Sequence, residues 1–146
     1  MNLKLADVFS DHLVLQSGRA APIWGWAAPG ASVKVRFADQ TQSAIADAGG
    51  RWAVRLDALP ACSDPRDLIV DASSGKQQIT IRHVVVGEVW ICSGQSNMVW
   101  PVGQSNDAEQ EIRAAHYPLI RLLTVPQHTA DQPQTESGGA VWQVWG

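Results

Sequence analysis

The first 83 residues contain short runs in which apolar and polar side chains alternate. In residues 33–37 and 51–56 every second side chain is apolar, which is the period of a β-strand with one buried and one exposed face. Further short strand candidates lie at residues 13–16, 23–26, 68–70 and 79–82. No run in this part has a helical period. We therefore predict an antiparallel β-sandwich, of the immunoglobulin or jelly-roll type, as a domain of residues 1–83.

Turn residues separate these runs. Ala28-Pro29-Gly30 places proline and glycine in the order that a type II turn requires. Residues 47–50, Asp-Ala-Gly-Gly, lie between the two clearest strand candidates, and their glycines suit the positive φ of a hairpin turn.

The pattern changes near His83. Residues 84–92 are almost continuously apolar, as in a strand that is buried on both faces of a parallel sheet. Residues 119–125 are a second run of this kind, which Pro126 ends. These runs predict two strands of an α/β domain.

A short helix is predicted between the two apolar runs. Asn106 and Glu109 have the spacing of a capping box. Ala108, Ile112 and Ala115 then form one apolar stripe, and Pro118 ends the helix. Strand, helix and strand in this order predict a βαβ unit, so we assign residues 84–146 to the N-terminal fragment of an α/β domain. Within it, we predict a polar loop at residues 127–139 and an apolar run at 141–145.

Composition excludes several classes of protein. The chain has 146 residues, 11 basic against 14 acidic side chains and a net charge of −3, so it offers no general attraction for nucleic acid. With 45% hydrophobic residues it has enough apolar material to form a core. No apolar stretch approaches the ~20 residues of a membrane span, and the first residues lack the apolar region of a secretory signal. We expect a soluble chain without a membrane partner, which is periplasmic or extracellular if a signal has been removed and cytoplasmic otherwise.

Two cysteines, Cys62 and Cys92, are too few for a disulfide scaffold. We expect two small buried thiols, with a single bridge as the alternative.

The tetrapeptide Gly-Gln-Ser-Asn occurs twice, at residues 94–97 and 103–106. The first copy follows a predicted buried strand, and open α/β sheets place their functional sites beyond the carboxyl ends of such strands. The second copy leads into the predicted helix, where Ser105 or Asn106 suits an N-cap. We therefore favour Ser96 as a nucleophile and Ser105 as structural, although glycine, serine and asparagine are common in any turn.

Residues 87–98, Gly-Glu-Val-Trp-Ile-Cys-Ser-Gly-Gln-Ser-Asn-Met, followed by Trp100-Pro101-Val102, closely resemble the nucleophile block of the sialate O-acetylesterases, which are members of the SGNH hydrolase superfamily. The resemblance extends upstream through residues 9–16, 24–30 and 50–52, and downstream from residue 111 through residue 121. Val99 departs from the pattern, because many relatives have glutamate there. The resemblance implies a β-sandwich followed by the start of an SGNH hydrolase domain, which is flavodoxin-like.

The resemblance also implies a function. The expected reaction is hydrolysis of an acetyl ester on a sugar, with sialic acid as the first candidate and other glycans such as acetylated xylan as the second. Ser96 would be the nucleophile, its own backbone N–H one donor of the oxyanion hole, and Gly94, Gln95 and Asn97 would support the loop. Trp100 is a candidate for the substrate pocket. We expect no metal and no other cofactor, and the sequence leaves the oligomeric state open.

A serine hydroxyl needs a base, which this superfamily supplies from a D-x-x-H element near the end of the esterase domain. The residues three places before His12, His83, His116 and His128 are Phe9, Thr80, Arg113 and Val125. None is aspartate, so we interpret all four histidines as structural or surface residues. We expect the chain alone to lack esterase activity, because the Asp and His of the triad are absent from it.

Seven tryptophans against one tyrosine leave a second hypothesis open. The chain is then a non-catalytic module that binds carbohydrate or another partner, with Trp24, Trp26, Trp52 or Trp100 as sugar platforms. For Trp52 we favour core packing strongly, because it shares a strand face with Val54 and Leu56; for Trp24 and Trp26 we favour it less strongly. A third possibility is that the sandwich only braces the esterase domain, and we favour this role for it.

Overall fold

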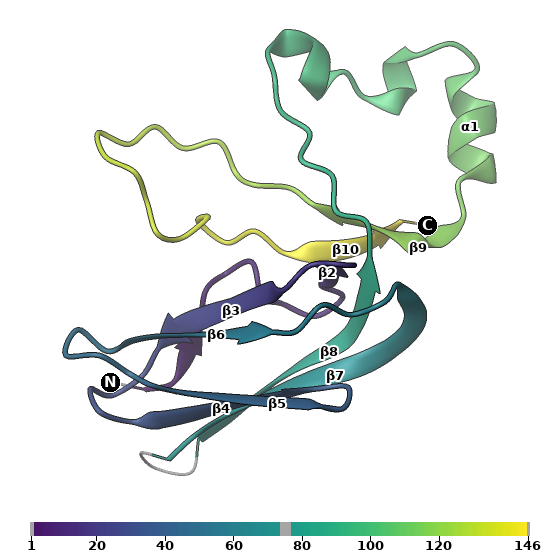
Figure 1. The fold of residues 1–146 in the computed structure, drawn as a ribbon. Coiled ribbons are helices and arrows are strands. Elements are labelled where there is room, and N and C mark those ends of the chain that lie inside the picture. The colour runs from purple at the N-terminus through teal and green to yellow at the C-terminus, as the bar shows by residue number, and fades with distance from the viewer. Residues whose placement is uncertain (1, 74–76, 146) are drawn as a thin grey trace.

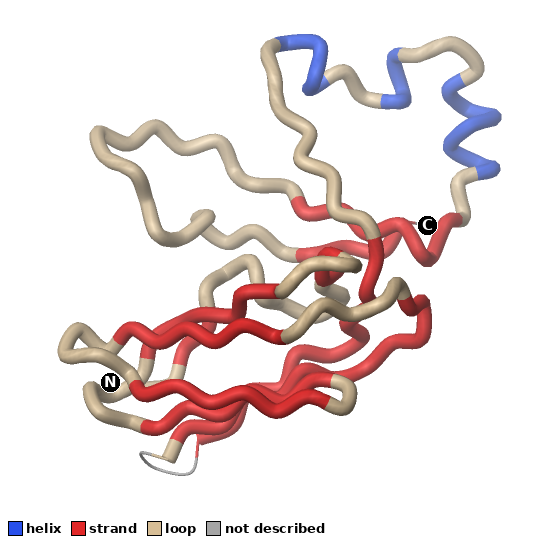
Figure 2. Tube along the Cα trace, viewed as in Figure 1, coloured by secondary structure: helices blue, strands red, loops and turns tan. Residues whose placement is uncertain are grey.

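The computed structural model describes residues 2–73 and 77–145. It is mostly β-strand with little helix, and residues 4–87 form two sheets that face each other, which we call the two-sheet unit (Figures 1 and 2). The smaller sheet has the order β1-β3-β6 and the larger the order β2-β8-β7-β4-β5. The strands of this unit are β1 (Lys4–Leu5), β2 (Val14–Gln16), β3 (Ala21–Trp26), β4 (Ser32–Phe37), β5 (Gln40–Ile45), β6 (Arg51–Leu56), β7 (Cys62–Ala72) and β8 (Gln77–Gly87).

The alternation of apolar side chains places the core between the two sheets. In β4 and β6 every second residue is buried, as predicted. Side chains from both sheets meet in one buried cluster that includes Ile23, Phe37, Leu56 and Leu68. Trp52 belongs to this cluster, as predicted. Burial of these apolar side chains is the main force that holds the sheets together.

The two predicted turns have different outcomes. Ala31 donates its N–H to the Ala28 carbonyl at 2.9 Å and Gly30 has a φ of 76°, which confirms the type II turn. Residues 47–50 form a turn with Gly50 at a φ of 80°, but this turn is no hairpin. It leads from β5 in the larger sheet to β6 in the smaller one, because β5, which the sequence did not predict, pairs with β4.

Gly25 allows the smaller sheet to take its third strand. β1 pairs with β3 in the register Lys4 to Trp26 and Leu5 to Gly25. A Cβ at Gly25 would overlap the Lys4 carbonyl oxygen. Glycine at this position therefore permits the close approach of the first strand.

β8 passes through the predicted domain boundary after residue 83. It pairs antiparallel with β7 and parallel with β2 along Val14–Gln16. Val84 and Val86 are part of the buried cluster. The first residues of the second predicted segment, 84–87, thus complete the larger sheet of the two-sheet unit.

The predicted buried strand at residues 84–92 ends early. Of the predicted residues 84–92, only 84–87 belong to β8, which ends at Gly87. Trp90 and Ile91 beyond it are 84% and 93% exposed. A strand is buried on both faces only where other layers cover it, and nothing in the described part of the chain covers residues 89–92. The prediction of a buried strand through Cys92 is therefore wrong for this structure.

The second predicted strand, at residues 119–125, forms two residues earlier as β9 (Tyr117–Leu123), with Pro118 inside it. Its residues are exposed or half-buried, so the prediction that this strand is buried on both faces is wrong for this structure. β9 pairs antiparallel with β10 (Trp142–Trp145) as a separate two-stranded sheet. Within residues 2–73 and 77–145, β8 and β9 are not neighbours in any sheet. The parallel pairing that a βαβ unit requires is therefore not formed between β8 and β9.

The helix α1 (Ala108–Ala114) forms, but without the predicted capping box. Asp107 takes the N-cap position with a φ of 55° and makes no side-chain cap bond. Its carbonyl accepts the N–H groups of Gln110 and Glu111 at 2.9 and 3.0 Å. The helix thus begins one residue later than an Asn106 cap predicts, and the prediction of that capping box is wrong. Ile112, in the predicted apolar stripe, is exposed.

The last strand is attached to the first loop of the chain, between β1 and β2 (Figure 1). The Trp142 indole N–H donates to the Val8 carbonyl at 2.8 Å, and its ring belongs to the buried cluster. Asp7 accepts hydrogen bonds from the Ser137 hydroxyl and the Gly139 N–H, both at 3.3 Å. Residues 137–142 are therefore packed against the two-sheet unit.

The cysteines differ from the prediction. Both are free thiols; Cys62 is half-buried and packs against the core, whereas Cys92 is exposed. The expectation of two buried thiols is wrong for Cys92, because it lies in the uncovered segment after β8. Among the helices of residues 2–73 and 77–145, none has the length and apolar character needed to cross a membrane.

Candidate active site

The first Gly-Gln-Ser-Asn copy lies beyond an extended arm, residues 88–94, that leaves the two-sheet unit where β8 ends (Figure 1). The short 3-10 helix η1 (Ser96–Val99) follows it. Met98 donates its N–H to the Gln95 carbonyl at 2.9 Å and closes this turn. Ser96 is exposed. The structure thus places the predicted nucleophile on the surface, at the first residue of a helical turn that follows a strand.

The neighbours of Ser96 form the loop. A Cβ at Gly94 would come within 2.6 Å of the Met98 Cγ, so glycine lets Met98 lie over the loop. Gln95 supplies the carbonyl that closes the turn, and the Asn97 carbonyl accepts the Trp100 N–H at 3.4 Å. These are contacts within the loop itself. That the three residues support a catalytic loop or an oxyanion hole stays a prediction.

Glu88 and Gln16 fix the point where the arm leaves β8. The Glu88 carboxylate accepts hydrogen bonds from the Gln16 amide at 3.1 Å and from the Ser17 hydroxyl at 2.8 Å. The Gln16 side-chain oxygen accepts the Val89 N–H at 2.9 Å. These bonds hold the pKa of the Glu88 carboxyl below its ordinary value; the Gln16 bond is the largest cause, and the Ser17 bond is the next. The end of β2 therefore directs the arm toward Ser96.

Glu88→Gln tests this anchor through its pH dependence. A lowered folded-state pKa stabilises the fold above the ordinary glutamate value of 4.5, and this stabilisation is lost as the pH falls through the folded-state value. Wild type is therefore expected to exceed Glu88→Gln in Tm at pH 7, with a smaller difference at pH 3. Thermal melts followed by circular dichroism at the two pH values measure it. A Gln16→Ala background lacks the main hydrogen-bond donor to Glu88, so the Tm difference caused by Glu88→Gln should there change less between pH 7 and pH 3. A Tm difference between wild type and Glu88→Gln that is the same at both pH values contradicts the anchor.

The second Gly-Gln-Ser-Asn copy takes part in local hydrogen bonds around a helical turn. It overlaps the 3-10 helix η2 (Val102–Gln104). The Ser105 hydroxyl donates to the Val102 carbonyl at 2.6 Å, and the Trp100 indole N–H donates to the Gln104 carbonyl at 3.3 Å. Ser105 caps the C-terminus of η2 and not the N-terminus of α1, so the prediction that Ser105 or Asn106 is the helix N-cap is wrong.

Ser96 has no base beside it in the described part of the chain. Its hydroxyl makes no hydrogen bond with any residue of 2–73 or 77–145. His116 follows α1 and His128 lies in the loop between β9 and β10, and both are exposed. The rings of the other two histidines, His12 and His83, stack on each other.

His12, His83 and Arg121 connect the two-sheet unit to β9. The two imidazole rings are stacked with centroids 5.2 Å apart, and both residues have positive φ. The Arg121 Nη1 lies 2.9 Å from the His12 Nδ1. A guanidinium can only donate, so the hydrogen bond runs from Arg121 to this ring nitrogen. Neither histidine was predicted to have such a contact, since no sequence pattern links residues 109 positions apart.

The residues near Ser96 in the sequence include apolar side chains that are open to solvent. Trp100, the predicted pocket residue, is 63% exposed and lies directly after η1. Trp90, Ile91, Met98 and Val99 are exposed as well. The predicted nucleophile segment is thus exposed, with exposed apolar residues on both sides of Ser96 in the sequence.

The chain was compared with protein-family models, with curated proteins and with solved structures. No family model matches the chain. It is 31% identical over 142 residues to the sialate O-acetylesterase of Homo sapiens, a match covering 90% of this chain and 27% of that protein. The mouse (Mus musculus) sialate O-acetylesterase is 30% identical over 135 residues, a match covering 86% of this chain and 25% of that protein. The crystal structure of a carbohydrate acetylesterase from Xanthomonas citri matches this chain with a TM-score of 0.92 at 36% sequence identity. The match covers 98% of this chain and 32% of the acetylesterase chain. The chain thus spans about a quarter of the curated relatives and a third of the solved one.

Proposed function

We propose that this chain forms part of a carbohydrate O-acetylesterase. Most of the chain is homologous to a segment of the sialate O-acetylesterases that makes up about a quarter of their length. Ser96 is the nucleophile, and the substrate is an acetyl ester on a sugar. The observation that carries the proposal is the similarity to an acetylesterase structure over 98% of the chain, a span that includes the Ser96 loop. Sialic acid is the first candidate substrate and another acetylated glycan the second.

The proposed reaction is acyl transfer in two steps. The Ser96 oxygen attacks the ester carbonyl, the sugar hydroxyl leaves, and an acetyl-serine forms; water then attacks this ester and releases acetate. Within residues 2–73 and 77–145 the Ser96 backbone N–H has no hydrogen-bond partner, which supports a role for it as an oxyanion donor. Ser96 transfers its proton to a histidine outside the four of this chain.

Residues 84–146 are proposed to supply the N-terminal part of an SGNH-type hydrolase domain, with the two-sheet unit as the β-sandwich that braces it. The exposed Trp90, Ile91 and Ile120 support this, because a domain of that kind covers such side chains with further strands and helices. Residues 137–142 and the His12–Arg121 contact support the bracing role, since they join the two parts.

A direct test compares the chain alone with a chimera, in which residues 1–146 replace the matching third of the Xanthomonas citri acetylesterase. We expect the chain alone to hydrolyse p-nitrophenyl acetate no faster than its Ser96→Ala variant, because both the base and further oxyanion donors are missing. The chimera should hydrolyse p-nitrophenyl acetate and release acetate from an acetylated sugar.

Two outcomes contradict the proposal. One is turnover by the chain alone that disappears in Ser96→Ala, which requires a base among its own histidines. The other is a folded chimera, with the Tm and circular dichroism of the parent enzyme, that has no esterase activity.

A further inference from the structure

A cluster of three basic side chains, His12, His83 and Arg121, lies between the two-sheet unit and the β9–β10 sheet. His12 precedes β2, His83 belongs to β8, and Arg121 belongs to β9. The two imidazole rings are nearly parallel, at an angle of 7°. Both histidines have a positive φ, 69° and 57°, which is uncommon for residues other than glycine. Two such residues in one stack indicate that the packing around them fixes their conformation.

The Arg121 guanidinium depends on its bond to His12. Within residues 2–73 and 77–145, its one hydrogen bond is the donation to the His12 Nδ1, and its Nε is buried without a partner. A guanidinium is always charged in a protein, and a charge that is removed from water without a partner is costly. Loss of the His12 bond would therefore leave this charge without any partner among the described residues.

The described part of the chain gives this cluster no acidic partner. No ion pair of residues 2–73 and 77–145 includes His12, His83 or Arg121. Asp11 is next to His12, but its Oδ1 accepts the Arg82 N–H at 2.7 Å. Arg82 is exposed, and its carbonyl accepts the His12 N–H at 2.9 Å. A protonated His12 ring would thus meet a cation from β9 and a second imidazole from β8.

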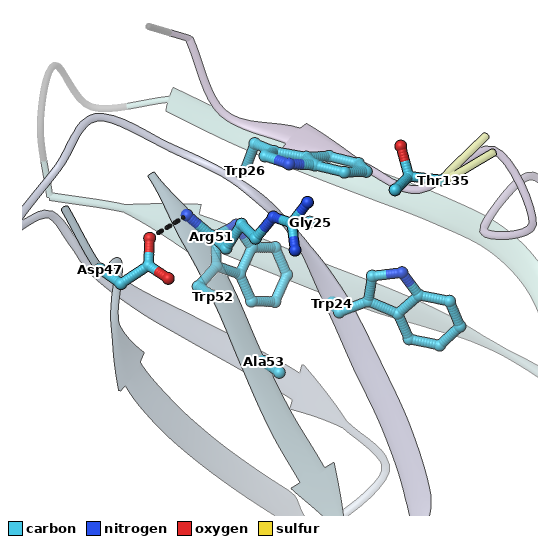
Figure 3. A pocket seen from close by; sticks show the side chains of 8 residues that line it. All are labelled: Trp24, Gly25, Trp26, Asp47, Arg51, Trp52, Ala53 and Thr135. Atoms are coloured by element: carbon cyan, nitrogen blue, oxygen red, sulfur yellow. Dashed lines mark hydrogen bonds between the residues drawn. The ribbon is translucent and has the colours of Figure 1, made fainter. Parts of the chain in front are cut away.

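The groove on the outer face of the smaller sheet is charged differently (Figure 3). Trp24, Trp26, Asp47 and Arg51 are among the residues that line it. Trp24 is 38% exposed, so the expectation that it is a core residue is wrong, whereas Trp26 is half-buried and packs against the core. The Asp47 Oδ1 accepts the Arg51 N–H at 2.8 Å. The charges of Asp47 and Arg51 therefore offset each other here, whereas the histidine cluster has basic side chains only.

The β9–β10 sheet depends on its contacts with the two-sheet unit, because a two-stranded sheet alone is marginally stable in water. One end of it is attached by Trp142, whose indole N–H donates to the Val8 carbonyl, and by Leu123, which packs against the core. Arg121 attaches the other end, residues 117–121 of β9, through His12. The first attachment contains no histidine, so only the second changes its charge near neutral pH.

We infer that His12, His83 and Arg121 form a pH-sensitive switch, which holds residues 117–121 against the two-sheet unit near neutral pH and loosens them in mildly acidic solution. Histidine is the side chain whose charge ordinarily changes between about pH 5 and 8. Both ring nitrogens of an imidazolium carry protons, so a protonated His12 cannot accept the Arg121 hydrogen bond, and the two cations repel each other. Protonation of His83 adds a second charge to the stack. The inference goes beyond the proposed function, because no part of it uses Ser96 or esterase activity.

Hydrogen–deuterium exchange of the full chain, read by mass spectrometry and corrected for the intrinsic effect of pH on exchange, tests the inference. Between about pH 7.5 and about pH 5.5, we expect the protection factors of residues 117–121 to fall about tenfold. Loss of one hydrogen bond to a charged group implies a factor of this size. The amides of β4 and β6, strands without a histidine, should keep their protection.

His12→Asn is the matched variant. Asparagine tolerates a positive φ, offers an acceptor oxygen to Arg121 and does not titrate. It should keep wild-type protection near neutral pH and show no fall in acid. Arg121→Met should show low protection of residues 117–121 at both pH values. His116→Gln, which changes an exposed histidine outside the cluster, should behave as wild type.

Three outcomes overturn the inference. The first is equal protection of residues 117–121 in wild type at both pH values. The second is a fall in acid that persists in His12→Asn or in Arg121→Met, and the third is a fall that His116→Gln abolishes. Where the amides of β4 and β6 show that His12→Asn is unfolded, Arg121→Met decides.

Discussion

In the chimera, Ser96→Ala is expected to lower kcat for p-nitrophenyl acetate by about 10⁴-fold or more, because loss of the nucleophile removes the covalent route altogether. KM should change little, since the Ser96 hydroxyl makes no hydrogen bond within residues 2–73 and 77–145 that would order the loop. Steady-state kinetics with the ester measure both constants. The lost factor is far larger than any structural effect of removing one exposed hydroxyl.

Ser105→Ala is the matched control, because Ser105 has the same neighbours in the sequence, Gly-Gln before it and Asn after it. It removes one hydrogen bond to the Val102 carbonyl, worth about 0.5–1.5 kcal/mol. We expect kcat within a fewfold of the unchanged chimera. Equal losses for Ser96→Ala and Ser105→Ala, or a large loss for Ser105→Ala alone, reject Ser96 as the nucleophile.

Phe37→Ala is expected to destabilise the chain by about 3–5 kcal/mol, because truncation of a buried phenylalanine loses its transfer free energy and leaves a cavity. Phe37 is 2% exposed, at the end of β4 where the core cluster reaches the turn to β5. That loss is a large part of the ~5–15 kcal/mol by which a domain is stable. Urea unfolding followed by tryptophan fluorescence measures the change in midpoint.

Ile45→Ala is the control for Phe37→Ala. Ile45 is also apolar and also in the β4–β5 pair, but it is 73% exposed. We expect a change within about 0.5 kcal/mol, as for most surface substitutions. Similar midpoint shifts for the two variants contradict a core centred between the two sheets.

The strands that the sequence predicted are those whose own pattern shows a buried face. β4 and β6 alternate clearly, and both formed where expected. β5 was missed because Gln40–Ile45 is largely polar and half exposed, so nothing in its pattern marks a strand. It forms because β4 offers it a full antiparallel ladder from Ser32 to Phe37.

Tryptophan burial was harder to predict because it depends on register. The sequence shows that Trp24 and Trp26 share a face, but not which face. Pairing with Ala53 and Arg51 puts them outward, while Ile23 and Trp52 fill the core. A slip of one residue in such a strand exchanges its two faces, so the exposure of Trp24 follows from tertiary pairing.

The candidate active site was predictable only as a segment. The position of Ser96 after an apolar run was read from the sequence, and the structure places it on an exposed turn after β8. The contacts that fix the arm, from Gln16 and Ser17 to Glu88, join residues more than 70 positions apart. No local pattern records such contacts.

The sequence by itself determined the mostly β character of the chain, its core strands, the Pro29–Gly30 turn and the Ser96 loop, because periodicity, turn chemistry and motifs are local properties. The tertiary structure decided where β8 ends, which partner β9 takes, and which face of β3 meets solvent. These choices depend on which strands and layers are present to pair with and to cover an apolar surface. Residues 84–92 have the pattern of a buried strand, and only residues 84–87 have neighbours that bury it.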